Sequence, residues 1–257
     1  TLGVTLAIPS SWPRPRRKNR PWVSWGTGTT WLDPYNRDNH DMITAMAVEA
    51  EALGFDEIQL DYIRFPVDDG TEFAAYPADD GRPRWQVLLD LLRQVDAAVS
   101  IPLGVDVFGL TAFDFGESYD LGQHLEEWTA HVEVISPMLY VNAMPGWAEG
   151  SPGRARFLVK TGVRQLRERV GPEPVIRPYL QSFRQGVEEY DWRFFLDQVR
   201  GAREGGADGF LFWHAGSRYG RLHCALQGPV RSLVPFPIDE RARLRREAQA
   251  PPQSEAE

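Results

Sequence analysis

The stretch that decides the fold runs from Gly54 to Pro66 and reads GFDEIQLDYIRFP. It begins with a glycine, where a helix can end, and closes with a proline, which has no N–H to donate to a strand ladder. Side chains alternate along a strand, so the polar face of this one carries Glu57, Gln59 and Asp61. Buried polar groups need partners, and the rim of a barrel can supply them. The last acid lies near the carboxyl end of the strand, where parallel α/β proteins place their chemistry.

The rest of the chain repeats the order strand, long loop, helix. The apolar patterns predict strands over 1–9, 55–63, 101–108, 132–140, 174–181 and 208–213. They predict helices over 36–53, 84–99, 119–130, 153–170 and 189–204. Long loops follow the strands and short ones follow the helices, which is typical of an α/β (β/α)8 TIM-type barrel with its site on one rim.

Six strands are two fewer than such a barrel contains. We expect that this chain lacks the first two β/α units, which would lie upstream of Thr1, because an open parallel edge leaves backbone donors unpaired. An open variant of the barrel is the alternative. We predict one barrel domain over 1–237, incomplete at its N-terminus, and a charged, disordered tail over 238–257.

Composition excludes several classes of protein. A net charge of −8 argues against a nucleic-acid binder. The basic segment 14–20 is interpreted as a solvated loop, with a contact for an anionic polymer or substrate as the alternative. A single cysteine, Cys224, excludes an intrachain disulfide and a thiolate metal cluster. No apolar run is long enough to predict a membrane span, and the sequence does not indicate an oligomeric state.

Two carboxylates are the candidate catalytic groups. Asp61 and Asp106 are predicted to point inward near the ends of neighbouring strands, which lie about 4.8 Å apart in a sheet. Cleavage of a glycosidic bond needs one protonated carboxyl and one ionised carboxylate around the substrate. Which aspartate is the acid, and whether the anomeric configuration is retained or inverted, stays open. The alternative is that either aspartate caps a loop or pairs with Arg64 or Arg177.

Polar and aromatic residues at the ends of the strands are the candidate substrate-binding groups. Arg64, three residues after Asp61, is placed to hold an ionised carboxylate or a substrate oxygen. Hydroxyl, amide and aromatic groups at strand ends can bind the hydroxyls and ring faces of sugars. The predicted substrate-binding residues are Tyr62, Arg64, Tyr140, Gln181 and Trp213.

Three motifs carry a resemblance to a known family. FDEIQLDYIRFP (55–66), WLDPYN (31–36) and GVDVFG (104–109) resemble the bacterial family called putative glycosyl hydrolase domain, over about residues 4 to 220. The resemblance implies a TIM-type barrel acting on carbohydrate, with Asp61 and Asp106 in the active-site positions. It also implies two further β/α units before the matching segment. By analogy, such a protein is expected outside the cell or at the cell envelope.

Two rival functions stay open. One is a catalytically inactive barrel that only binds carbohydrate at the cell envelope. The other is a metal hydrolase that uses the acidic loop residues Asp68, Asp69, Asp79 and Asp80. We expect no cofactor and no metal, since the five histidines form no H-x-H or H-E-x-x-H motif. G-x-S-x-G and Walker motifs are also absent from the sequence.

Overall fold

The computed structural model describes residues 14–15, 22–23, 30–67, 71–113, 121–144, 146, 148 and 150–233. The chain divides into two compact units. The first contains Thr1–Val105 and Glu117–Val132, and the second contains Asp106–Gly116 and Glu133–Glu257.

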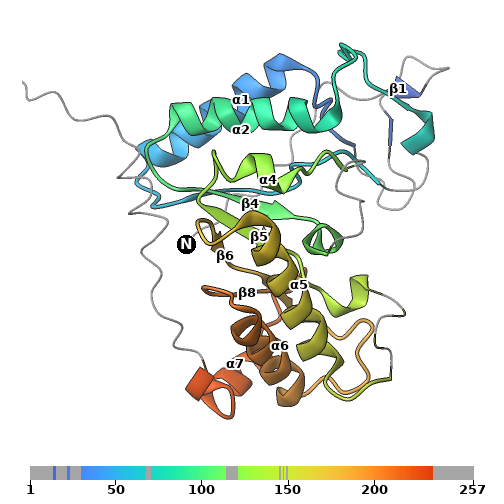
Figure 1. Cartoon of the computed structure of the whole chain (residues 1–257), viewed down its shortest axis with the longest axis vertical. Helices are drawn as coiled ribbons and strands as arrows, with labels where there is room; N and C mark the ends of the chain where they lie inside the picture. Colours follow the sequence, from blue (N-terminus) through green and yellow to red (C-terminus); the bar gives the residue numbers. More distant parts are fainter. Residues whose placement is uncertain are drawn as a thin grey trace, which may run out of the picture. The chain divides into compact units, whose positions relative to one another are not determined.

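The first unit contains parallel strands and several helices. Its main elements are α1 (Arg37–Ala52), β2 (Ile58–Leu60), α2 (Arg84–Ala98), the start of β4 (Leu103–Val107) and α4 (Leu125–Trp128). β2 and β4 run parallel, with Leu60 opposite Val105. α1 and α2 lie side by side (Figure 1). One face of α2 is fully buried, including Leu92 and Val95, because its apolar residues recur at helical spacing.

Local signals set the ends of α1. The side chain of Asn36 accepts a hydrogen bond from the backbone N–H of Asp38 at 2.9 Å, which satisfies one of the free donors of the first turn. Beyond the last turn, Gly54 has a φ of 88°, a conformation that glycine adopts without a Cβ clash. The predicted helix over 36–53 is therefore confirmed, with its cap and its end.

Part of the basic segment is a strand. β1 (Arg14–Pro15) pairs antiparallel with β3 (Ala74–Ala75), which follows the 3-10 helix η1 (Thr71–Phe73). The prediction of a loop over 14–20 is thus wrong at its first two residues, because they find a strand partner about sixty residues further along the chain. The remainder of the segment lies outside the described residues.

The second unit contains more parallel pairs and three further α-helices within its described residues. Its main elements are the end of β4, η2 (Gly109–Ala112), β5 (Val134–Pro137), η3 (Val141–Ala143), α5 (Arg154–Val170), β6 (Val175–Ile176), β7 (Tyr179–Gln181), α6 (Trp192–Gly205), β8 (Leu211–Trp213), α7 (Gly220–Gln227) and η4 (Arg231–Leu233). β5 pairs with β6, and β7 pairs with β8, both in parallel.

The strand predicted over 174–181 is broken in two. β6 ends at Ile176 and β7 begins at Tyr179, on either side of Pro178. Proline has no N–H to donate to a ladder, so the break falls where pairing would be lost. After the break, β7 pairs with β8 rather than with β5, apart from one bridge between Met138 and Tyr179.

Two glycines let α5 and α6 approach closely (Figure 1). A Cβ added at Gly201 would lie 2.6 Å from the carbonyl oxygen of Arg156. One added at Gly205 would lie 2.7 Å from Cβ of Val163. Both distances are shorter than real contacts, so any larger residue would push the helices apart.

The described chain has a mixed α/β fold in which strands alternate with helices as predicted. β2, β4, β5 and β8 lie inside the predicted strands but are shorter. α2, α5 and α6 confirm the helices predicted at those places, the helix predicted over 119–130 is reduced to α4, and α7 was not predicted. The strand predicted over 1–9 and the tail over 238–257 lie outside the described residues. Barrel closure and the two missing units stay predictions.

Candidate active site

In the first unit, Asp61 lies in a tight turn that directly follows β2. The backbone N–H of Tyr62 donates to Oδ1 of Asp61 at 2.7 Å, and the N–H of Arg64 donates to the carbonyl of Tyr62 at 2.8 Å. The side chain of Gln123 holds the turn by donating to the carbonyl of Ile63 at 3.1 Å. The turn places the carboxyl of Asp61 at the carboxyl end of its strand, as predicted.

Burial raises the pKa of Asp61 above its ordinary value. The hydrogen bond from Tyr62 and the positive charge of Arg64 act in the opposite direction, but more weakly. A carboxyl in this environment keeps its proton to higher pH than a free aspartic acid. That is the property a general acid needs.

Tyr62 has an unusual backbone conformation. Its φ is 58°, in the left-handed region that costs a residue with a side chain about 1–2 kcal/mol. Tyr62 is 52% exposed, so burial of its ring does not offset the free energy of this backbone conformation. Strain of this kind is found most often at functional sites.

Tyr62, Arg64 and Trp31 form an aromatic and cationic group beside Asp61, which we call the Trp31 cluster. The guanidinium carbon of Arg64 lies 4.6 Å from the centroid of the Trp31 ring and 5.3 Å from that of Tyr62. The two rings meet edge to face, with centroids 5.7 Å apart. Arg64 is only 8% exposed, whereas Tyr62 faces solvent. The sequence predicted Tyr62 and Arg64 as site residues but not Trp31.

The WLDPYN motif has structural roles beyond Trp31. Asp33 is buried and accepts hydrogen bonds from the backbone N–H groups of Tyr35 and Ala78, both at 3.0 Å. Burial raises the pKa of Asp33. The rings of Tyr35 and Phe65 pack edge to face at 5.5 Å. With Asn36 as the cap of α1, the motif fixes the segment that carries Trp31.

In the second unit, Asp106 lies within β4 and is buried. Its neighbour Val107 accepts a hydrogen bond from the backbone N–H of Met138 at 3.0 Å, which holds the end of β4 beside the end of β5. Asp106 is therefore on a rigid strand.

An aromatic chain follows the ends of β5, β7 and β8. The ring of Tyr140 lies 5.7 Å from that of Phe183, and Phe183 lies 6.4 Å from the imidazole of His214. The backbone N–H of Gly216 donates to Nδ1 of His214 at 2.9 Å. When Nδ1 accepts a hydrogen bond, the proton of the neutral imidazole lies on Nε2. This Nε2–H can donate a hydrogen bond to a ligand. Neither Phe183 nor His214 was predicted, because the signal is a contact between loops far apart in sequence.

Gln181 is completely buried and holds loops in place. Its Nε2 donates to the carbonyls of Phe183 and Gln185, both at 2.8 Å, and its Oε1 accepts from the backbone N–H of Asn142 at 3.0 Å. The prediction placed this amide at the rim as a substrate ligand. In the structure, the side-chain amide of Gln181 holds the segments that carry Tyr140 and Phe183.

Trp213 ends β8 and is 43% exposed, so its indole is accessible, and its role in binding substrate stays a prediction. The structure brings Asp61, Tyr62 and Arg64 together in the first unit. In the second unit, Tyr140 and Gln181 both contact Phe183.

The acidic loop shows no metal site where it is described. Asp79 accepts from the backbone of Gly81, and Asp80 forms an ion pair with Arg82 at 2.8 Å. Asp68 and Asp69 lie outside the described residues. Within the part of the chain that the structure describes, no group of three or more His, Cys, Asp or Glu could hold a metal ion.

Residues 10–219 match the family described as "putative glycosyl hydrolase domain". The chain belongs to this family. The predicted resemblance is confirmed, over most of the range expected from the three motifs. The comparison with curated proteins gives no match.

Two solved structures are similar to this chain. The glycoside hydrolase domain of PgaB (BpsB) from Bordetella bronchiseptica gives a TM-score of 0.58 at 16% identity, covering 84% of this chain and 68% of that one. The spore cortex-lytic enzyme SleL from Bacillus cereus gives 0.49 at 15% identity, covering 74% of this chain and 52% of that one. The first similarity shows a shared fold.

No helix in the described part of this family member is long and apolar enough to cross a membrane.

Proposed function

We propose that the protein hydrolyses glycosidic bonds in an oligo- or polysaccharide, with Asp61 and Asp106 as its two carboxylates. The observation that carries the proposal is the register of β2 and β4, in which Leu60 lies opposite Val105. Asp61 is the first residue after β2, and Asp106 is the next residue within β4. Residues at the same register of parallel neighbours share a face of the sheet, which supports a common role for the two carboxyls.

The environment of Asp61 favours it as the proton donor. Its raised pKa keeps a proton available for the leaving oxygen of the glycosidic bond. In this assignment Asp106 is the ionised partner, which attacks the anomeric carbon or takes a proton from the attacking water. The sequence alone left these roles open.

The exposed rings are the proposed contacts for sugar. The Trp31 cluster supplies the ring of Tyr62 beside Asp61, and an aromatic face can stack on the apolar face of a pyranose. In the second unit we propose the same role for Tyr140 and Trp213, with the Nε2–H of His214 as a donor to a sugar hydroxyl. We further propose that both units belong to one barrel domain, because strands and helices alternate through both.

The test is a glycan panel assayed for new reducing ends with the wild-type protein and Asp61→Asn. Release of sugar by the wild-type protein, abolished in the variant, would support the proposal. Binding of a glycan by both proteins without turnover by either would instead support the inactive carbohydrate-binding barrel. A chelator should leave the rate unchanged, since two carboxylates need no metal.

A further inference from the structure

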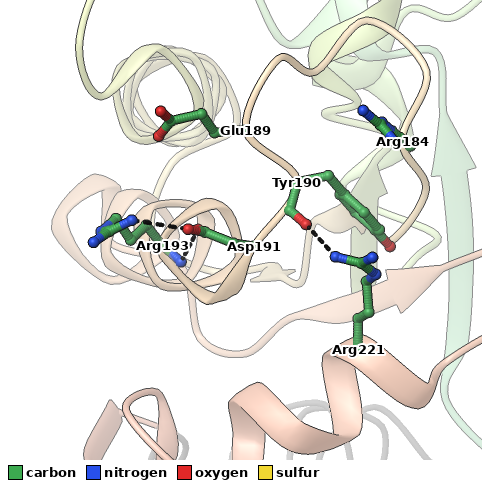
Figure 2. A pocket seen from close by; sticks show the side chains of 6 residues that line it. All are labelled: Arg184, Glu189, Tyr190, Asp191, Arg193 and Arg221. Carbon is green, nitrogen blue, oxygen red and sulfur yellow. Dashed lines mark hydrogen bonds and ion pairs between the residues drawn. The ribbon is translucent and has the colours of Figure 1, made fainter.

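The second unit has a cavity of about 550 Å³ that is separate from the groups described above. Figure 2 shows the residues that line it, which come from the segment after β7 and from the first turns of α6 and α7. They are Arg184, Glu189, Tyr190, Asp191, Arg193 and Arg221. Three arginines against two carboxylates give this lining a net positive charge, although the whole chain carries −8.

One arginine and one carboxylate of the lining are already paired. Nη1 of Arg193 donates to Oδ2 of Asp191 at 2.9 Å, and Oδ1 of Asp191 accepts from the backbone N–H of Arg193 at 2.7 Å, which caps α6. The Arg193 guanidinium also stacks over the ring of Trp192 at 5.0 Å. This pair stabilises the wall of the cavity and leaves little net charge for a ligand.

Arg221 is held in place by neutral groups. Its Nη1 donates to the carbonyl of Tyr190 at 3.0 Å, and its guanidinium carbon lies 5.7 Å from the centroid of the Tyr190 ring. Tyr190 is itself fixed, because its hydroxyl donates to the carbonyl of Ser182 at 2.7 Å. The guanidinium of Arg221 is therefore oriented, and no described carboxylate forms an ion pair with it.

Arg184 forms no ion pair or side-chain hydrogen bond among the residues that the structure describes, and it is exposed. The remaining carboxylate, Glu189, lies on the other side of Tyr190 from Arg184 and Arg221 (Figure 2). Two arginines thus face the cavity beside an aromatic ring. A guanidinium has a fork of N–H donors that matches the two oxygens of a carboxylate.

We propose that this cavity binds a carboxylate-bearing saccharide, with Arg184 and Arg221 on the carboxylate and Tyr190 against the sugar ring. That the ligand is a saccharide rests on the proposed function, whereas its negative charge rests on the cavity alone. Segments that follow β7 and β8 also carry Phe183 and His214, so an acidic sugar bound here extends the proposed substrate-binding surface.

The experiment is calorimetric titration of the full chain carrying Asp61→Asn, so that no ligand is consumed. The probes are tetragalacturonate, its neutral methyl ester and inorganic phosphate. We expect the acid to bind at least about tenfold more tightly than the ester, since charge-assisted hydrogen bonds are lost in the ester. We expect its affinity to fall as salt is raised.

Three substitutions locate the binding. Arg184→Gln, which removes no side-chain hydrogen bond or ion pair with a described residue, should weaken tetragalacturonate binding about tenfold, and adding Arg221→Gln should weaken it further. Arg164→Gln removes an exposed arginine of α5 outside the cavity and is the matched control, with no expected change. Thermal unfolding of each variant shows whether it folds.

Equal binding of the acid and the ester, or no effect of Arg184→Gln, would overturn the inference. Phosphate binding without tetragalacturonate binding would also overturn it, in favour of a site for free inorganic anions. These results are independent of hydrolysis. If the wild-type protein binds the acid at this cavity but cleaves no glycan, only the proposed function fails.

Discussion

The guanidinium carbon of Arg64 lies 4.6 Å from the centroid of the Trp31 ring, in a site where Arg64 is only 8% exposed. The ring attracts the cation and shields it from water. Arg64 also acts electrostatically on Asp61, which lies in the same turn. The Trp31 cluster therefore forms an aromatic surface beside Asp61, the candidate acid.

Trp31→Leu should weaken the binding of an oligosaccharide substrate, because it removes the ring that orients Tyr62 and Arg64. We expect KM to rise about three- to tenfold, the amount that one aromatic contact contributes. Phe157→Leu is the control, since Phe157 is an exposed ring on α5 of the other unit. An equal KM in the wild-type protein and Trp31→Leu would remove Trp31 from the site.

The left-handed conformation of Tyr62 makes a prediction about stability. Tyr62→Gly should be more stable than Tyr62→Ala by about 0.5–1 kcal/mol, because glycine avoids the Cβ clash but loses more freedom on folding. Urea unfolding of the two variants measures the difference. At Leu53, which has a φ of −78°, the same pair of substitutions should give no advantage to glycine. If glycine is no more stabilising than alanine at Tyr62, as expected at Leu53, the backbone at Tyr62 is unstrained.

Gln181→Leu should lower the free energy of unfolding by about 2–4 kcal/mol. It leaves two carbonyls and one backbone N–H of a partly buried network without their partner. Gln94→Leu, which removes an exposed contact with Asp41, should cost less than about 0.5 kcal/mol. Equal effects on the urea midpoint would mean that the Gln181 amide holds no loop.

The pKa of Asp61 predicts how stability depends on pH. Burial raises the pKa in the folded protein above that of the unfolded chain, so the ionised form is disfavoured by folding. The destabilisation of the fold by the ionised carboxylate is absent below the pKa of Asp61 in the unfolded chain. It increases as the pH rises toward and through the pKa of Asp61 in the folded protein. The asparagine side chain of the Asp61→Asn variant carries no charge in either state. This variant should therefore unfold at a higher temperature than wild type at pH 7, with the difference shrinking toward pH 4. A difference that is constant over this range would contradict the raised pKa.

Local sequence signals predicted the helices well and the site only in part. The ends of α1 follow from Asn36 and Gly54, which act on their own neighbours. The break at Pro178 also has a local cause, although the change of pairing partner depends on β8. Alternation placed Gln181 on a polar face but could not show that loops cover it. The contact of Trp31 with Arg64 joins residues about thirty positions apart, so no periodicity reveals it.

The most direct test of the account compares reducing-end release from a glycan panel by the wild-type protein, Asp61→Asn, Asp106→Asn and the control Asp56→Asn. Asp56 is an exposed carboxylate in the same segment as Asp61. For a glycan that the wild-type protein cleaves, we expect each of the first two substitutions to lower kcat at least about a hundredfold while the protein stays folded, and we expect no effect of Asp56→Asn. Cleavage by folded Asp61→Asn or Asp106→Asn at the wild-type rate would contradict this expectation.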